Sequence, residues 1–154
     1  MKESPELRDA VEGELRDLIA ELDSVQPLLD KVFATEPDAI ELRAIAATLH
    51  AYYNGVERVF VLIAKNFSEL PVESHTWHRD LLKLMSTSTD RRPQVISHEL
   101  CDELSQLLGF RHFFRHAYPM RLKWDLLRPL VKHLEVSRRA FKREIYAFLT
   151  TLDQ

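Results

Sequence analysis

Residues 42–67 read LRAIAATLHAYYNGVERVFVLIAKNF. Apolar side chains recur in this stretch at alternating spacings of three and four residues, which is the repeat of one face of an α-helix. They are Leu42, Ile45, Leu49, Tyr52, Val56, Val59, Ile63 and Phe67. Because this pattern is not interrupted, it predicts one long helix that begins near Pro37 and buries this face.

The same repeat precedes this stretch and predicts a first helix within residues 1–33. Ser4 is suited to the N-cap and Pro5 to the first helical position. The apolar face comprises Leu7, Val11, Leu15, Leu18, Leu22, Val25 and Leu29. Pro27 is expected to kink or end this helix, because proline removes a backbone donor and crowds the preceding turn.

Three further helices are expected toward the C-terminus. A short one starts after Ser74 as its N-cap, and residues 86–93, STSTDRRP, form a loop after it. A fourth helix begins within residues 94–97 and runs toward Pro119, since the residue before a proline avoids helical dihedrals. A last helix begins between Asp125 and Pro129 and ends near Leu152. The apolar face of the short helix comprises Trp77, Leu81 and Leu84 or Met85. That of the fourth helix comprises Leu100, Leu104 and Leu107 or Leu108. That of the last helix comprises Leu130 or Val131, Leu134, Phe141, Ile145, Phe148 and Leu152.

These elements predict an all-α, up-and-down helical bundle of four long helices and one short helix. No segment alternates apolar and polar residues for long enough to indicate a strand. A chain of 154 residues with 45% apolar residues can close one core. Without a Gly/Ser-rich linker, residues 1–154 are expected to form a single domain.

The composition favours a cytoplasmic protein. No apolar run approaches the roughly 20 residues that span a bilayer, and the first residues, MKESPELRDAVEGEL, are acidic and unlike a signal peptide. Cys101 is the single cysteine, so no internal disulfide can form, as is usual in a reducing compartment. We therefore expect no membrane association.

Charge is distributed unevenly along the chain. Residues 1–45 carry twelve Asp/Glu against five Lys/Arg, whereas residues 110–145 carry ten Lys/Arg against three Asp/Glu. The basic excess would suit a surface that binds phosphate groups. The alternative is that acidic and basic helices attract one another within or between protomers. The charge pattern favours neither reading.

Arg111 breaks the apolar pattern of the fourth helix. The spacing that gives Leu107 continues to Arg111, Phe114 and Tyr118, so a guanidinium group occupies a core-facing position. Burial of an unpaired charge is too costly, so Arg111 is expected to face a cleft, a partner subunit or an anion. The alternative is that Gly109 ends or twists the helix and turns Arg111 outward.

Two histidines accompany Arg111. His112 and His116 are four residues apart and therefore lie one above the other on a helix. Arg111 and His116 are five apart, and an ideal helix would splay them by about 140°. They can act together only where the helix ends, near Pro119, or across a two-fold axis between subunits. Imidazole moves protons near neutral pH and guanidinium holds phosphate, so the cluster suits phosphodiester cleavage.

The string Arg111-His112-Phe113-Phe114-Arg115-His116-Ala117-Tyr118 resembles the Arg-x4-His-x-Tyr signature of HEPN-domain ribonuclease toxins, in particular the HepT-like toxins. The resemblance covers roughly residues 42–152 and leaves the first helix outside it. Further matches are Leu49-His50-Ala51-Tyr52-Tyr53-Asn54-Gly55-Val56-Glu57-Arg58, Trp77-His78 with Leu81-Leu82, and Arg92-Pro93.

The resemblance implies an all-α homodimer in which two signature segments build one RNA-cutting cleft without a metal ion or another cofactor. Arg111 and His116 match the catalytic pair, and His112 fills the position after the arginine, where the family usually has a polar residue. Tyr118 matches the tyrosine that a cognate minimal nucleotidyltransferase antitoxin modifies with AMP. We expect RNA as the substrate and this antitoxin as the protein partner.

Five further residues are candidates for RNA binding. Arg115, Arg121 and Lys123 lie in or just after the signature segment, and the motif fixes no role for Arg115. Asn54 and Glu57 are three residues apart on the second helix and could approach the cleft from the side. They could equally form a solvated or hydrogen-bonded polar pair.

Two alternatives stay open at this stage. His75 and His78, with His98 and Cys101, could be imagined as a zinc site, but neither pair has an obvious third ligand nearby. The same helical dimer could also serve as a non-catalytic nucleotide-binding or adaptor subunit that partners a nucleotidyltransferase. The adaptor would bind nucleotide or partner without cutting RNA.

Overall fold

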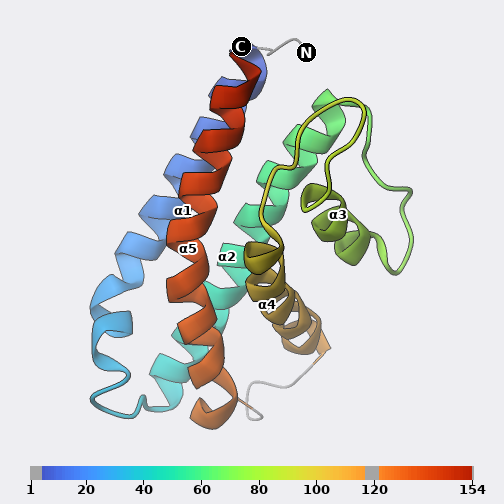
Figure 1. Ribbon diagram of the computed structural model, residues 1–154. Helices are drawn as coiled ribbons and strands as arrows, with labels where there is room; N and C mark the ends of the chain where they lie inside the picture. Colours follow the sequence, from blue (N-terminus) through green and yellow to red (C-terminus); the bar gives the residue numbers. More distant parts are fainter. Residues whose placement is uncertain (1–4, 117–121, 154) are drawn as a thin grey trace.

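A computed structural model describes residues 5–116 and 122–153. Its five helices are α1 (Pro5–Lys31), α2 (Ala39–Asn66), α3 (Trp77–Met85), α4 (His98–His116) and α5 (Trp124–Leu152). The predicted all-α bundle of four long helices and one short helix is confirmed (Figure 1). Within the described ranges, β-pairing is limited to an isolated bridge between Thr89 and Arg92. None of the helices described is both long and apolar enough to cross a membrane.

Helix α2 is the central element and contacts each of the other four helices. The apolar face predicted from the sequence is buried along most of its length, with Tyr52, Val56 and Ile63 fully inaccessible. Asp38 fixes where the helix begins: its carboxylate accepts the Glu41 N–H at 2.8 Å, and the Glu41 carboxylate accepts the Asp38 N–H at 3.1 Å. This reciprocal capping box satisfies two backbone donors at the exposed end of α2.

Helices α1 and α5 lie side by side along one side of α2 (Figure 1). The Arg8 guanidinium donates to the Leu149 carbonyl at 3.1 Å, which ties the start of α1 to the end of α5. Pro27 does not end α1, which continues to Lys31. The expected N-cap, Ser4, lies outside the described residues.

Helix α5 begins at Trp124, one residue before the predicted range, and Pro129 lies inside it. Because proline lacks an N–H, its position in the second turn deprives only the Asp125 carbonyl of its helical partner. A proline this close to the start is therefore compatible with helix on both sides of it.

Helix α3 begins later than predicted, and the assignment of Ser74 as its N-cap is wrong. The Ser74 hydroxyl accepts the Thr76 N–H at 3.3 Å and its carbonyl accepts the Trp77 N–H at 3.3 Å, which closes a turn before the helix. The N-cap is Thr76, whose side chain makes no capping hydrogen bond. Serine competes for backbone donors in turns as readily as at caps, and here the turn prevails.

Buried Arg92 fixes the loop between α3 and α4. Its side chain is inaccessible to solvent, and its Nε donates to the Glu69 carboxylate at 2.8 Å. The remaining guanidinium nitrogens donate to three backbone carbonyls, those of Leu84, Thr87 and Pro93, at 3.1, 2.8 and 3.1 Å. One side chain thus joins the end of α3, the loop after it and the segment after α2, and so positions α3 against α4.

Candidate functional site

The signature segment lies on an uninterrupted helix. Helix α4 runs through Gly109 to His116, and no glycine in the described residues has a positive φ. Helix α4 begins at His98, one residue after the predicted range, and Ser97 caps its start, because the Ser97 hydroxyl accepts the Leu100 N–H at 3.1 Å. The alternative in which Gly109 ends the helix is wrong, and Arg111 keeps the inward register that the sequence predicted.

Arg111 is half-buried between α2 and α3. Its Nε donates to the Asn54 side-chain oxygen at 2.9 Å, and its Nη1 lies 3.4 Å from His78 Nε2. Among the residues that the structure describes, no carboxylate forms an ion pair with Arg111. The guanidinium is therefore held in place by Asn54 and His78 without a carboxylate partner, which leaves its charge available for an anion.

His78 links Arg111 to a buried acid. Its Nδ1 lies 2.7 Å from Oε2 of Glu57, a residue on α2 that is only 8% exposed. An ionised carboxylate can only accept, so Nδ1 carries the hydrogen, and in the tautomer that has no hydrogen on Nε2 this atom accepts from Arg111 Nη1. Glu57, His78 and Arg111 thus form a chain that fixes the guanidinium.

His50 lies under the same cluster. Its Nε2 is 3.1 Å from the Asn54 side-chain nitrogen, and its ring centroid is 4.9 Å from that of Phe114. Since the Asn54 oxygen accepts from Arg111, its amide nitrogen donates to His50, which fixes the orientation of Asn54. Burial lowers the pKa of the His50 imidazole below its usual 6.5, and the guanidinium groups of Arg111 and Arg115 lower it further.

The lowered pKa of His50 predicts a loss of stability in mild acid. The unfolded chain binds the His50 proton as the pH falls through about 6.5, whereas the folded chain binds it only at lower pH. The free energy of unfolding should therefore be largest above this range and decrease as the pH falls toward the folded pKa. Urea denaturation at about pH 7.5 and 5.5 should show a smaller decrease for His50→Gln than for the unsubstituted protein. Equal decreases would contradict the assignment.

His112 and His116 are both exposed on α4, with ring centroids 4.6 Å apart. The predicted placement of His112 and His116 one above the other on a helix is confirmed, and their rings are tilted by 55° to each other. Arg111 points instead toward Asn54 and His78, and in the described part of the chain no hydrogen bond joins it to either histidine. One copy of the chain therefore does not bring Arg111 and His116 together.

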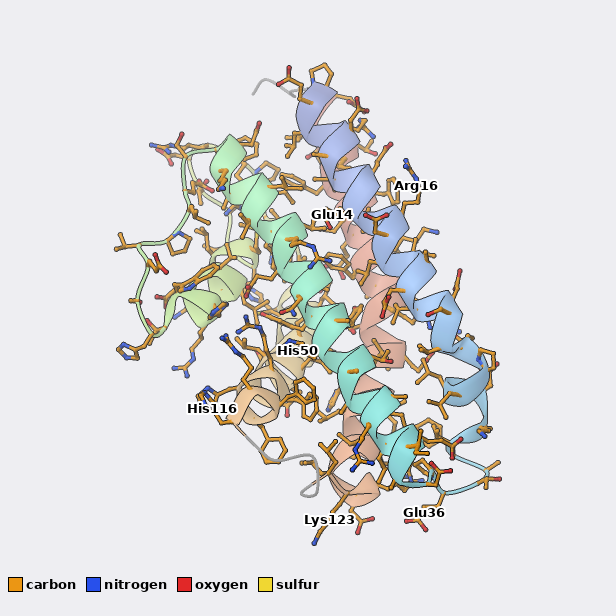
Figure 2. All side chains as sticks on the ribbon, turned by 180° about the vertical axis from the view of Figure 1, so that it is seen from behind. Glu14, Arg16, Glu36, His50, His116 and Lys123 are labelled. Carbon is orange, nitrogen blue, oxygen red and sulfur yellow. The ribbon has the colours of Figure 1, made fainter. Side chains whose placement is uncertain are left out.

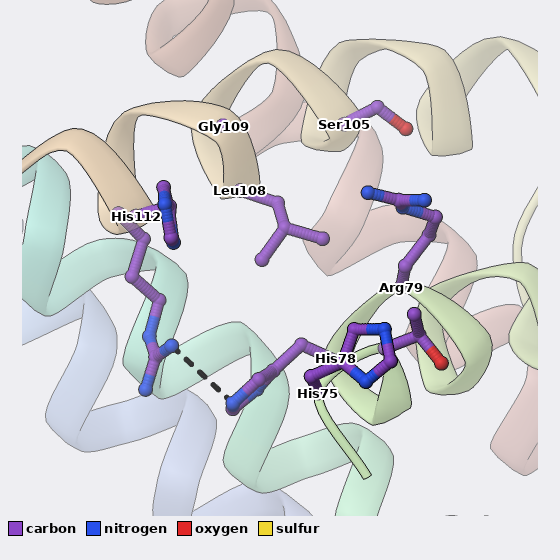
Figure 3. A pocket seen from close by; sticks show the side chains of 9 residues that line it. His75, His78, Arg79, Ser105, Leu108, Gly109 and His112 are labelled. Carbon is purple, nitrogen blue, oxygen red and sulfur yellow. Dashed lines mark hydrogen bonds between the residues drawn. The ribbon is translucent and has the colours of Figure 1, made fainter.

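A pocket of about 530 Å³ opens between the start of α3 and α4 (Figure 3). We call it the α3–α4 pocket; its lining residues are His75, Thr76, His78, Arg79, Ser105, Leu108, Gly109, Arg111 and His112. Two guanidinium groups and three imidazoles face it, and no acidic side chain lines it. A basic, partly apolar pocket of this size suits a phosphate-bearing ligand such as a nucleotide.

Some of the charge asymmetry is balanced within the chain. Acidic residues of α1 pair with basic residues of the neighbouring helices: Glu14 with Arg58 at 2.9 Å and Asp23 with Arg138 at 3.8 Å. The basic residues of α4 have no such partners in the described residues, and Arg115 is exposed. The attraction between acidic and basic helices therefore accounts for part of the charge pattern at α1, and the basic residues of α4 stay candidates for binding phosphate groups.

The other candidates are scattered. Tyr118 and Arg121 lie outside the described residues, as does Pro119. Lys123 is exposed immediately before α5, at an end of the molecule away from His116 (Figure 2). In the described residues, no three His, Cys, Asp or Glu side chains are arranged to hold a metal ion.

Two residues of the site, His50 and Arg79, were given no role in the sequence analysis, and His75 and His78 were considered only as zinc ligands. One turn of α2 separates His50 from Asn54, and Glu57 follows on the same face, so helical spacing could have indicated His50. The residues of α3 reach the site only through the packing of α3 against α2 and α4, which no local pattern reveals.

A comparison with protein families identifies the region that contains the site. Residues 44–152 match the family described as HepT-like protein, a region that contains α3, α4 and α5 and nearly all of α2. No curated protein and no solved structure matched the chain. The matched region holds every site residue named above and leaves α1 outside it. On this match, the chain belongs to the HepT-like family.

Proposed function

We propose that the protein is a metal-independent endoribonuclease toxin that cuts RNA in a cleft shared by two copies of the chain. The observation that carries the proposal is the state of Arg111. Its guanidinium is held by Asn54 and His78, has no acidic partner among the described residues and faces a basic pocket. A charge fixed in this way is suited to stabilise a phosphate on which negative charge develops.

In the proposed reaction, His116 takes the proton from an RNA 2′-hydroxyl. The 2′-oxygen then forms a bond to the adjacent phosphorus, and the bond from phosphorus to the 5′-oxygen of the next nucleotide breaks. His116 of the second copy gives a proton to that leaving oxygen, while Arg111 stabilises the charge on the phosphate. The products carry a 2′,3′-cyclic phosphate and a 5′-hydroxyl.

Two copies are needed because of the geometry of α4. Arg111 faces inward and His116 is exposed on the same uninterrupted helix, so one chain presents them in different directions. A two-fold axis beside the exposed histidines would place His116 of each copy in one cleft near Arg111. The homodimer is therefore part of the proposal.

In this proposal, a covalent modification inhibits the nuclease activity. A minimal nucleotidyltransferase acting as antitoxin would attach AMP to Tyr118, which lies outside the described residues but only two positions after His116. The modification adds bulk and negative charge beside the histidine, so RNA would be excluded by occupancy and by repulsion.

His78 should act as a positioning residue for Arg111. His78→Ala removes the acceptor for Arg111 and leaves the Glu57 carboxylate unpaired, so we expect RNA cleavage to fall by roughly 10- to 100-fold. His78→Gln offers a donor to Glu57 and an acceptor to Arg111, so it should restore much of the rate. Single-turnover cleavage by the two variants tests this, and an alanine variant as active as the glutamine variant would contradict it.

The proposal is tested by incubating the purified protein with a labelled RNA in the presence of a chelator. We expect fragments that end in a 2′,3′-cyclic phosphate. Replacing the ribose at the cleaved position with 2′-deoxyribose should prevent the cut, because the attacking oxygen is then missing. Nucleotide binding without any cleavage would instead favour the adaptor reading, and cleavage that requires added metal would contradict the mechanism.

A further inference from the structure

We infer that the α3–α4 pocket is a second phosphate subsite, in which Arg79 and His75 hold the RNA strand one nucleotide away from the phosphate that is cut. This inference rests on the proposed function, because RNA is taken as the ligand. It assigns a binding role to α3, which carries none of the residues of the signature segment.

Arg79 and His75 are exposed and face the pocket (Figure 3). Among the described residues, neither side chain forms an ion pair or a hydrogen bond. Of the other basic groups of the pocket, His78 contacts Glu57 and Arg111 contacts Asn54, whereas His112 is exposed beside His116 on α4. On the side of the pocket formed by α3 and the segment before it, Arg79 and His75 are thus the groups that a ligand could bind without breaking an existing hydrogen bond.

The arrangement of the pocket fits a strand with more than one phosphate. Arg111 and Arg79 come from different helices and line the same pocket, so each guanidinium can hold a separate phosphate. Between them, α4 presents Ser105, Leu108 and Gly109. A Cβ added at Gly109 would meet nothing within 4 Å, so the wall is open there. This open wall leaves room for a ribose and a base between two phosphates.

Charge favours the same ligand. No carboxylate lines the pocket to repel a polyanion, and the neighbouring acid, Asp80, accepts a hydrogen bond from Thr76 at 3.0 Å. Because Arg79 is exposed, binding a phosphate there costs little desolvation of the guanidinium. Each phosphate that the protein neutralises also releases counterions, which gives the subsite a measurable salt dependence.

The test measures binding, not cleavage. A fluorescent RNA oligonucleotide with 2′-deoxyribose at every position that could be cut is titrated with the unsubstituted protein, Arg79→Ala, His75→Ala and Arg16→Ala. Arg16→Ala is the matched control, because it removes the same charge as Arg79→Ala. Arg16 is exposed on α1 and lies across the molecule from His116 (Figure 2).

Arg79→Ala should weaken binding by about tenfold and reduce the slope of log affinity against log salt by about one. His75→Ala should weaken binding less, and Arg16→Ala should leave both quantities unchanged. Helical circular dichroism of each variant checks that the fold is intact.

The outcomes separate this inference from the proposed function. If the Arg79→Ala variant binds RNA as tightly as the Arg16→Ala variant, the subsite would be overturned even if the protein cuts RNA. If the unsubstituted protein binds RNA more tightly than Arg79→Ala but never cuts RNA, the subsite would be supported and the proposed nuclease function would be contradicted. AMP carries a single phosphate. If AMP binds as tightly as the oligonucleotide, and Arg79→Ala weakens the binding of both equally, the inference that Arg79 holds a second phosphate would be overturned.

Discussion

Replacing His116 with alanine is expected to lower the rate of RNA cleavage by roughly 10²- to 10⁴-fold, because a general acid or base typically contributes that much. Arg111→Ala should lower the rate by about 10²- to 10³-fold, as expected for loss of one group that stabilises developing charge. His116 is exposed on α4, so its substitution should leave the helical circular dichroism unchanged. Single-turnover cleavage of a labelled RNA in the presence of a chelator measures both effects.

His98→Ala is the matched control for His116→Ala. His98 is also an exposed histidine on α4, at the opposite end of the same helix. The control variant should cut RNA at the unsubstituted rate. If His116→Ala were as active as His98→Ala, proton transfer by His116 would be excluded.

Replacing Arg92 with alanine is expected to decrease the free energy of unfolding by about 3–5 kcal/mol, the usual cost of removing one partner from a buried ion pair. The variant leaves the Glu69 carboxylate, itself only 10% exposed, without its guanidinium. It also leaves the carbonyls of Leu84, Thr87 and Pro93 without their donor. Urea denaturation followed by circular dichroism gives the change directly.

The neighbouring arginine provides a comparison. Arg91 is exposed, and its Nη1 donates to the carbonyls of Phe67 and Ser68 at 2.7 and 3.0 Å. Arg91→Ala should cost no more than about 1 kcal/mol, because water can replace these exposed hydrogen bonds. Equal losses of stability for the two variants would show that burial of Arg92 does not anchor the loop.

Sequence periodicity was enough to predict the long helices. The apolar spacing from Leu42 to Phe67 gave α2, because a buried face of this length is compatible with only one regular structure. The start of α3 was misplaced because serine hydroxyls satisfy backbone donors in turns as well as at helix caps, and only the observed hydrogen bonds of Ser74 distinguish them.

The site was predictable only in part. Arg111 could be found because a charge in a core-facing register has to be satisfied by something polar, and the structure supplies Asn54 and His78. His78 itself could not be assigned, because its contact with Arg111 spans 33 residues of sequence and depends on how Arg92 and the loop place α3. Local spacing carries no information about such a contact.

The most direct test of the central claim is a crystal structure of the protein bound to an RNA oligonucleotide with 2′-deoxyribose at the cleaved position. The account predicts two copies of the chain related by a two-fold axis. One phosphate should lie within hydrogen-bond distance of the Arg111 guanidinium, with His116 of both copies facing the atoms on either side of the bond that breaks. RNA bound on a face remote from Arg111, or held by a single chain with His116 pointing away from it, would contradict the account.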